Sequence, residues 1–260
     1  MPVHERYHMS RLIFVAATVA CFFSSSAQAQ EAPPANTDKP RVYVSVFAGG
    51  LSPDAQTFFG RNEAGVLRDI VVDYDAPVTA GVNVGVVAVD KPFGRLRVEG
   101  ELSFRSARVQ ALSLNGIDRV VLAGSKSSAA TGFVNLWYDT PKILGVVRVS
   151  AGAGFGLASI DNNILYLVAN PANTNGQARI AIPDSNTTFA YQLMGGVELD
   201  VSRSFSIIGD VRHVRFGDYQ AQRYILNTPG VLGGNGGTLD SVLESKWAAT
   251  SITAGVRFKF

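Results

Sequence analysis

Apolar and polar residues alternate one by one along most of this sequence. The stretch LRVEGELSFR, residues 96–105, places its leucine, valine and phenylalanine side chains at even positions and its arginine, glutamate and serine side chains at odd positions. VTAGVNVGVVAV (78–89) and AATSITAGVRFKF (248–260) follow the same rule. Successive side chains of a β-strand point to opposite faces, so the alternation predicts strands that each have one apolar face and one polar face.

The same period of two predicts an all-β chain of eight strands. No segment shows the apolar stripe of an amphipathic helix. The predicted strands are about 10 to 14 residues long, which is longer than most strands of soluble proteins but suited to crossing a bilayer at a tilt. They span residues 41–50, 77–89, 95–108, 129–139, 145–158, 188–200, 205–216 and 247–260.

The connections between these strands alternate between long and short. The short ones lie near DKPFG, TPKIL and VSRS, and the long ones are expected at 51–76, 109–128, 159–187 and 217–246. Strands joined by short turns are antiparallel neighbours, so all short turns fall at one end of the sheet. The pattern predicts an antiparallel up-and-down β-barrel with all of its long loops at one end. ILYLV (164–168) is compatible with a strand that extends above the membrane or with a contact patch.

The contents of the two faces indicate which face lies inside this barrel. An eight-stranded barrel has an interior only wide enough for its own side chains. Glycines such as Gly152, Gly154 and Gly156 share the polar face with charged residues. The opposite face carries no arginine or lysine in the strands that contain Val78, Leu96, Val147, Phe189 and Ala248. A cation on a lipid-facing position costs about 2 to 4 kcal/mol at the bilayer midplane. We therefore expect a transmembrane barrel with an apolar, lipid-facing exterior and a polar interior.

Acidic and basic residues are then expected to pair inside the barrel, because buried charges require partners. Aromatic residues near the strand ends, among them Trp137 and Phe216, are expected to form girdles at the membrane interfaces. The predicted interior charge network comprises Arg97, Glu99, Glu101, Arg105, Arg148, Glu198, Asp200, Asp210, Arg212, Arg257 and Lys259.

The first 40 residues have the composition of an export segment. Two arginines precede the apolar run LIFVAATVACFF, and Ala27 and Ala29 form an A-x-A site, so residues 1–29 are predicted to be a signal peptide cleaved after Ala29. An uncleaved anchor and lipidation at Cys21 are the alternatives, but the run is short for a span and Thr18 fits a lipidation box poorly. Residues 30–40 are predicted to be a flexible periplasmic leader, and 41–260 the barrel domain.

Several stretches of the sequence resemble small outer-membrane β-barrels of the OmpA/OmpX-like and surface-antigen group. The resemblance rests on LRVEGELSFR, GFVNLWYDT, FAYQLMGGVELDVS and the terminal AGVRFKF. It implies a location in the bacterial outer membrane, export by the Sec pathway, insertion by the barrel-assembly machinery and contact with outer-membrane lipid. It also implies that Val256, Phe258 and Phe260 form the assembly signal. The chain departs from full-length OmpA proteins after Phe260, so we expect no peptidoglycan-binding domain.

Catalytic and cofactor chemistry has little support in this sequence. Removal of the signal peptide would remove the one cysteine and leave His213 as the sole histidine. Lipid A deacylase barrels have a serine two residues after the histidine, whereas this chain has Arg215 two residues after His213. Glu99 and Glu101 share a face and could form a carboxylate pair, but charge pairing in the lumen is the simpler interpretation. We expect no enzyme activity, cofactor or metal.

The functional prediction is a non-enzymatic outer-membrane barrel with a structural or surface-contact role through its four long loops. The loops could contact an extracellular ligand or a host surface, because binding residues concentrate on loops held by a rigid scaffold. The alternative is a narrow, porin-like channel for ions or small solutes. The 23 basic and 21 acidic residues nearly balance, so the charge gives no reason to expect nucleic-acid binding.

Overall fold

The computed structural model describes residues 41–169, 177–226 and 237–260, and all of its regular structure is β. The predicted signal peptide and leader lie outside these ranges. Within them, no helix is long and apolar enough to cross a membrane. The strands are β1 Val42–Pro53, β2 Gln56–Asn62, β3 Leu67–Lys91, β4 Gly94–Leu114, β5 Ile117–Arg119, β6 Lys126–Asp139, β7 Val147–Ala169, β8 Gln177–Asp200, β9 Phe205–Phe216, β10 Tyr219–Leu226, β11 Gly237–Lys246 and β12 Ala248–Lys259.

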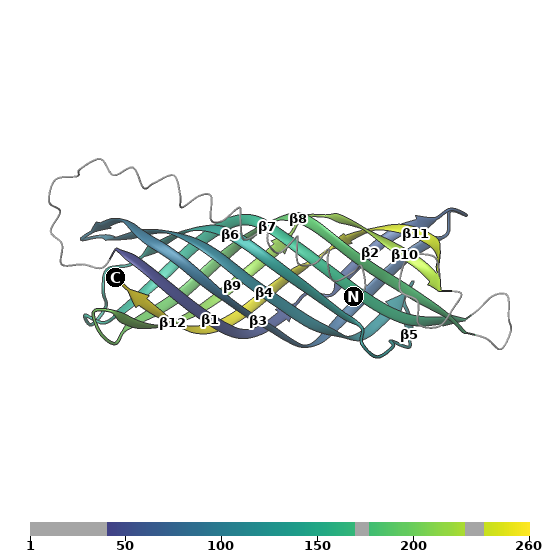
Figure 1. The fold of residues 1–260 in the computed structure, drawn as a ribbon, viewed down its shortest axis with the longest axis horizontal. Helices are drawn as coiled ribbons and strands as arrows, with labels where there is room; N and C mark the ends of the chain where they lie inside the picture. Colours follow the sequence, from purple (N-terminus) through teal and green to yellow (C-terminus); the bar gives the residue numbers. More distant parts are fainter. Residues whose placement is uncertain (1–40, 170–176, 227–236) are drawn as a thin grey trace, which may run out of the picture.

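These strands form one antiparallel sheet that wraps into an elongated cylinder (Figure 1). Neighbours in the order β3-β1-β12-β9-β8-β7-β6-β4 are hydrogen-bonded, and β3 pairs in addition with β4. The three short connections predicted from the sequence are confirmed: they join β3 to β4, β6 to β7 and β8 to β9. They lie at the end of the cylinder where the C-terminus is found, while β5, β10 and β11 lie at the opposite end (Figure 1).

The prediction of four long loops between the strands was wrong, because the described part of the chain contains twelve strands and the additional ones lie in the regions expected to be loops. Most of the regions expected to be loops, 51–76, 109–128, 159–187 and 217–246, are strand wherever the structure describes them. Strands β3, β4, β7 and β8 each run for 21 to 25 residues. Strands β2, β10 and β11 continue the lines of β1, β9 and β12 after one- or two-residue breaks. ILYLV is therefore a strand extension, within β7.

In the half of the cylinder near the short connections, the predicted sidedness is confirmed. Phe104 is 53% exposed on the outer face, and its chain neighbour Arg105 is 1% exposed on the inner face. The outer face here forms a belt of exposed apolar side chains, which we call the apolar belt. It includes Val78, Val82, Val84, Val86, Leu96, Val98, Leu136, Val149, Phe155, Leu157, Phe189, Leu193, Val197, Val211, Ile252 and Phe258.

Glycines on the inner face make room for the largest inward side chains. Trp137 of β6 lies opposite Gly152 of β7. A Cβ atom on Gly152 would lie 2.7 Å from the indole ring of Trp137, which is closer than van der Waals contact allows. The inward glycines predicted from the sequence therefore match the width limit of a small barrel.

In the other half of the cylinder, which we call the extension, the contents of the two faces are exchanged. The inner face of β7 changes from Arg148, Ser150 and glycines to the buried Ile160, Ile164 and Tyr166. On β8, Ile180 and Ile182 are likewise buried. The cores of the extension comprise Leu51, Phe58, Ile70, Val72, Leu112, Leu114, Phe133, Ile160, Ile164, Tyr166, Ile180, Ile182, Val214, Phe216, Leu243 and Trp247, with smaller residues between them. Outward positions of the extension carry polar residues such as Asp73, Thr187, Gln220, Gln222 and Glu244, together with a few exposed apolar ones such as Phe59, Leu239 and Val242.

Candidate functional site

The inner face of the belted half carries many buried charged side chains, and all the charged residues predicted for the lumen lie on it. Arg97, Glu99, Glu101, Arg105, Glu198, Arg212 and Arg257 are buried, and the side chains of Arg148, Asp200, Asp210 and Lys259 are 10% to 16% exposed. The period of two places them there, because each occupies an inward position on β4, β7, β8, β9 or β12. The structure resolves them into two clusters.

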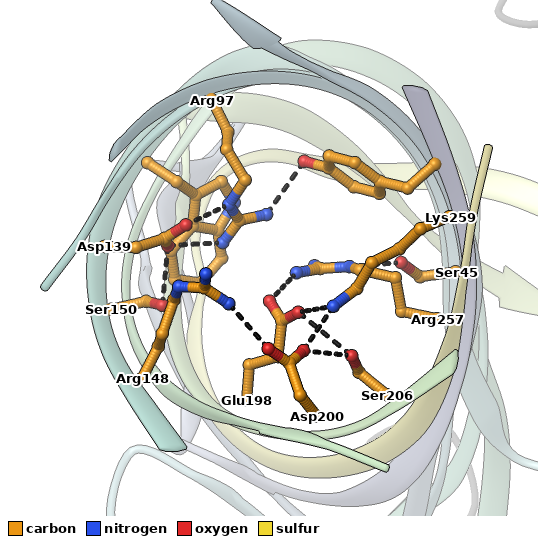
Figure 2. A network of polar contacts seen from close by, with 12 residues as sticks. Ser45, Arg97, Asp139, Arg148, Ser150, Glu198, Asp200, Ser206, Arg257 and Lys259 are labelled. Carbon is orange, nitrogen blue, oxygen red and sulfur yellow. Dashed lines mark hydrogen bonds and ion pairs between the residues drawn. The ribbon is translucent and has the colours of Figure 1, made fainter. Parts of the chain in front are cut away.

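The first cluster lies near the short connections and is centred on Asp139 (Figure 2). Arg97 binds Asp139 with two parallel bonds, Nε to Oδ2 at 2.7 Å and Nη2 to Oδ1 at 2.8 Å. Arg95 donates to the same carboxylate at 2.6 Å and Ser150 at 2.7 Å. Forked arginine–carboxylate pairs fix geometry as well as charge. Arg95 and Asp139 were not among the predicted network residues, although the period of two from Arg97 and Trp137 places both inward.

Glu198 and Asp200 extend this cluster across the lumen. Glu198 accepts from Arg257 at 2.6 Å, from Lys259 at 2.6 Å and from Arg95 at 3.1 Å. Asp200 pairs with Arg148 at 2.9 Å, and also with Lys259. The two carboxylates therefore link cations from β4, β7 and β12, so the network crosses from one wall of the barrel to another.

Glu99 completes this cluster with aromatic donors. Tyr43 Oη donates to Glu99 at 2.8 Å and Trp137 Nε1 donates at 3.2 Å, while Arg97 and Arg257 form ion pairs with it. Trp137 and Phe216 are each 2% exposed, so their assignment to an interfacial girdle was wrong. The period of two already places Trp137 inward, because it shares a face of β6 with Phe133 and Asn135.

The second cluster lies deeper in the lumen and is centred on Glu101. Arg212 bridges Glu101 at 2.7 Å and Asp210 at 2.8 Å. Gln192 and Asn135 also donate to Glu101, each at 2.9 Å. Arg105 stands apart from these ion pairs, because it donates to the hydroxyls of Ser103 and Thr131. Beyond this cluster the lumen fills with the apolar core of the extension.

The extension also contains polar groups among its apolar residues. Tyr219 accepts from Gln56 at 2.6 Å and from Asn162 at 2.9 Å, and burial raises the pKa of its hydroxyl to about 12. Burial also raises the pKa of Asp184 to about 6, although Asn186 donates to its carboxylate at 2.6 Å. Arg223 pairs with Asp240 and donates to Tyr166. These bonds satisfy polar side chains that the packed interior separates from water.

The arrangement gives little support to catalysis. His213 faces outward in the apolar belt, and Thr250 Oγ1 lies 3.0 Å from its Nδ1. Glu99 and Glu101 are both saturated with donors from arginine, tyrosine, tryptophan or amide groups. In the ranges that the structure describes, no group of three or more histidine, cysteine or acidic side chains is placed to hold a metal ion.

Comparisons with known proteins agree with this architecture. The model of the family described as outer membrane protein beta-barrel domain matches residues 15–260. No curated protein matches the sequence. Among solved structures, outer membrane protease OmpT from Escherichia coli is similar with a TM-score of 0.52 and 12% identity, over 88% of this chain and 99% of that chain. OprG from Pseudomonas aeruginosa gives a TM-score of 0.47 and 9% identity, over 85% and 98%. At such identities the similarity concerns the fold.

The Asp139 cluster predicts a large stability difference between matched variants. Asp139→Asn leaves the buried Arg95 and Arg97 without their shared carboxylate, so the free energy of unfolding should fall by about 3 to 5 kcal/mol. Asp218→Asn breaks an exposed pair with Lys246 at 3.6 Å and should cost less than about 1 kcal/mol. Urea unfolding in lipid vesicles measures both. Equal losses in the free energy of unfolding would show that ion pairs in the lumen stabilise the fold no more than surface ion pairs do.

Proposed function

The chain belongs to the outer membrane protein beta-barrel domain family and is an outer-membrane protein, and from this premise we propose that it forms a closed, non-enzymatic, eight-stranded barrel. Its role is structural and extends to surface contacts. The strand pairings support the eight-strand count, because β1-β3-β4-β6-β7-β8-β9-β12 are paired in sequence and β12 pairs back with β1. The continuous filling of the lumen carries the proposal of a closed barrel.

Two successive layers support closure against ions. The ion pairs of Arg97, Glu99, Glu198 and Arg257 connect opposite walls of the belted half. The apolar core that contains Phe133, Phe216 and Trp247 fills the next part of the interior. An ion crossing the barrel would have to break buried ion pairs and then enter an apolar layer, and both steps are costly.

Exposed apolar side chains of the extension support a role in surface contacts. Phe59 is 54% exposed and Ile117 58% exposed, both beyond the apolar belt, on strands β2 and β5. Large apolar side chains that stay exposed to water mark candidate contact sites. Because the extension is built of paired strands, these side chains are held on a rigid support rather than on long loops.

Conductance separates the closed barrel from the alternative of a narrow channel. The refolded protein in a planar lipid bilayer should give no single-channel steps. A variant with Arg97→Ala, Glu198→Ala and Arg257→Ala removes the layer of ion pairs. Its conductance reports whether the apolar core alone closes the barrel to ions. Regular steps in the unsubstituted protein would contradict the closed barrel, and their persistence in the triple variant would favour the channel.

Adhesion tests the surface role. Phe59→Ser combined with Ile117→Ser should reduce the attachment of expressing bacteria to cultured epithelial cells, with unchanged amounts of protein in the outer membrane. Phe93→Ser is the matched control, because Phe93 is 70% exposed in the short connection at the opposite end of the barrel. Attachment that is unchanged in the double variant, or reduced equally by Phe93→Ser, would contradict this role.

A further inference from the structure

Arg105 is a buried cation that lacks a carboxylate partner. Its side chain is 1% exposed, and its Nη1 donates to Thr131 Oγ1 at 2.7 Å and to Ser103 Oγ at 3.1 Å. Both acceptors are neutral hydroxyls, and the Nε of Arg105 has no partner. Arginine stays protonated in proteins, so this position holds a full positive charge out of water. A charge buried in this way is costly unless an anion compensates it.

The carboxylates of the lumen are occupied by other cations. Glu101 lies two residues away on the same strand, but its Oε2 accepts from Arg212 at 2.7 Å and its Oε1 from Ser103 at 2.9 Å. Asp210 is also paired with Arg212. Glu99, Asp139, Glu198 and Asp200 all pair within the first cluster. Within the described ranges, no carboxylate lies at ion-pair distance from Arg105.

Further hydrogen-bonding groups without partners lie in the same row of the barrel wall. Thr79 of β3 is directly opposite Arg105, and Thr253 of β12 follows in that row, with only Gly49 of β1 between the two threonines. Both threonines are 3% exposed, and neither hydroxyl has a partner among the described residues. The amide of Asn83 is also unpartnered and 1% exposed, but it lies four residues further along β3, opposite Glu101, and so outside this row. Buried polar groups without partners are rare in proteins.

We propose that this row binds one small inorganic anion, with chloride as the ligand. The Arg105 Nε–H and the two threonine hydroxyls can all donate, and the guanidinium supplies the charge. The apolar layer begins beside them: Ala129 lies opposite Arg105 on β6, and Leu51 follows Gly49 two residues along β1. Low polarity strengthens the attraction between the cation and an anion, and close packing favours a single atom over an oxyanion.

Bromide replaces chloride as a probe of this site. Protein refolded from urea in sodium bromide and crystallised from the same salt should show one anomalous bromine peak beside Arg105 and Thr79. Refolding lets the ion enter before the lumen closes. A water molecule at that position without anomalous signal, or bromide confined to the protein surface, would overturn the proposal.

Thermal unfolding in detergent provides the matched measurement. Bromide should raise the midpoint for the unsubstituted protein relative to sodium gluconate at equal ionic strength, and this shift should vanish in Arg105→Met. Arg215→Met, on the exposed outer face of β9, is the control and should keep the shift. Thr79→Val retains the charge and should raise the half-maximal bromide concentration about tenfold, as expected for one lost hydrogen bond to a charged group.

Thr79→Val keeps the test decisive if Arg105→Met does not refold. A bromide shift that is the same in the unsubstituted protein, Arg105→Met and Thr79→Val would overturn the proposal. So would a shift that Arg215→Met abolishes, because the halide would then act at the surface.

Discussion

Strands β7 and β8 keep one alternation along their whole length, whereas β3 and β4 change between odd and even inward positions at irregular pairings between Asp73 and Val78. On each of these strands, the residues that face the lumen near the short connections continue into residues that face the core of the extension. What changes along the strand is the kind of residue on each face. On β7 the inner face passes from Arg148, Ser150 and glycines to Ile160, Ile164 and Tyr166. The apolar side chains therefore move from outside to inside where the surroundings change from lipid to water. The apolar belt, the polar lumen and the packed extension all depend on this exchange.

Inside the belt, the limited width of the barrel leaves two requirements for inward residues. They must be small where large neighbours cross the lumen, as Gly152 is beside Trp137, and they must be paired where they carry charge. Arg97 with Asp139, and Arg257 with Glu198, satisfy the second requirement at short distances. For Arg105, which contacts Glu101 only through the Ser103 hydroxyl, the proposed chloride would be the direct partner. The paired charges in the narrow lumen therefore both stabilise the barrel and contribute to closing it.

Strand pattern and sidedness could be predicted from the sequence because the belted half combines apolar residues with glycine and charge in strict alternation. The extension could not, since the inner residues Ile164 and Tyr166 alternate with Leu165 and Leu167 in ILYLV and blur the period. Charged positions such as Glu99 and Arg212 followed from period two alone, whereas the partners of each depended on barrel register. Trp137 was misplaced because its position near a strand end was given more weight than the period of two, which places it inward with Phe133 and Asn135.

The exchange of faces is tested most directly by placing one arginine on each side of the boundary. Ala153 lies outward in the apolar belt between Leu136 and Leu193, and Thr187 lies outward six residues beyond Leu193 on β8, about 20 Å along the strand. In lipid vesicles, Ala153→Arg should lower the free energy of unfolding by about 2 to 4 kcal/mol, and Thr187→Arg should change it by less than about 0.5 kcal/mol. Equal costs at the two positions would contradict the account.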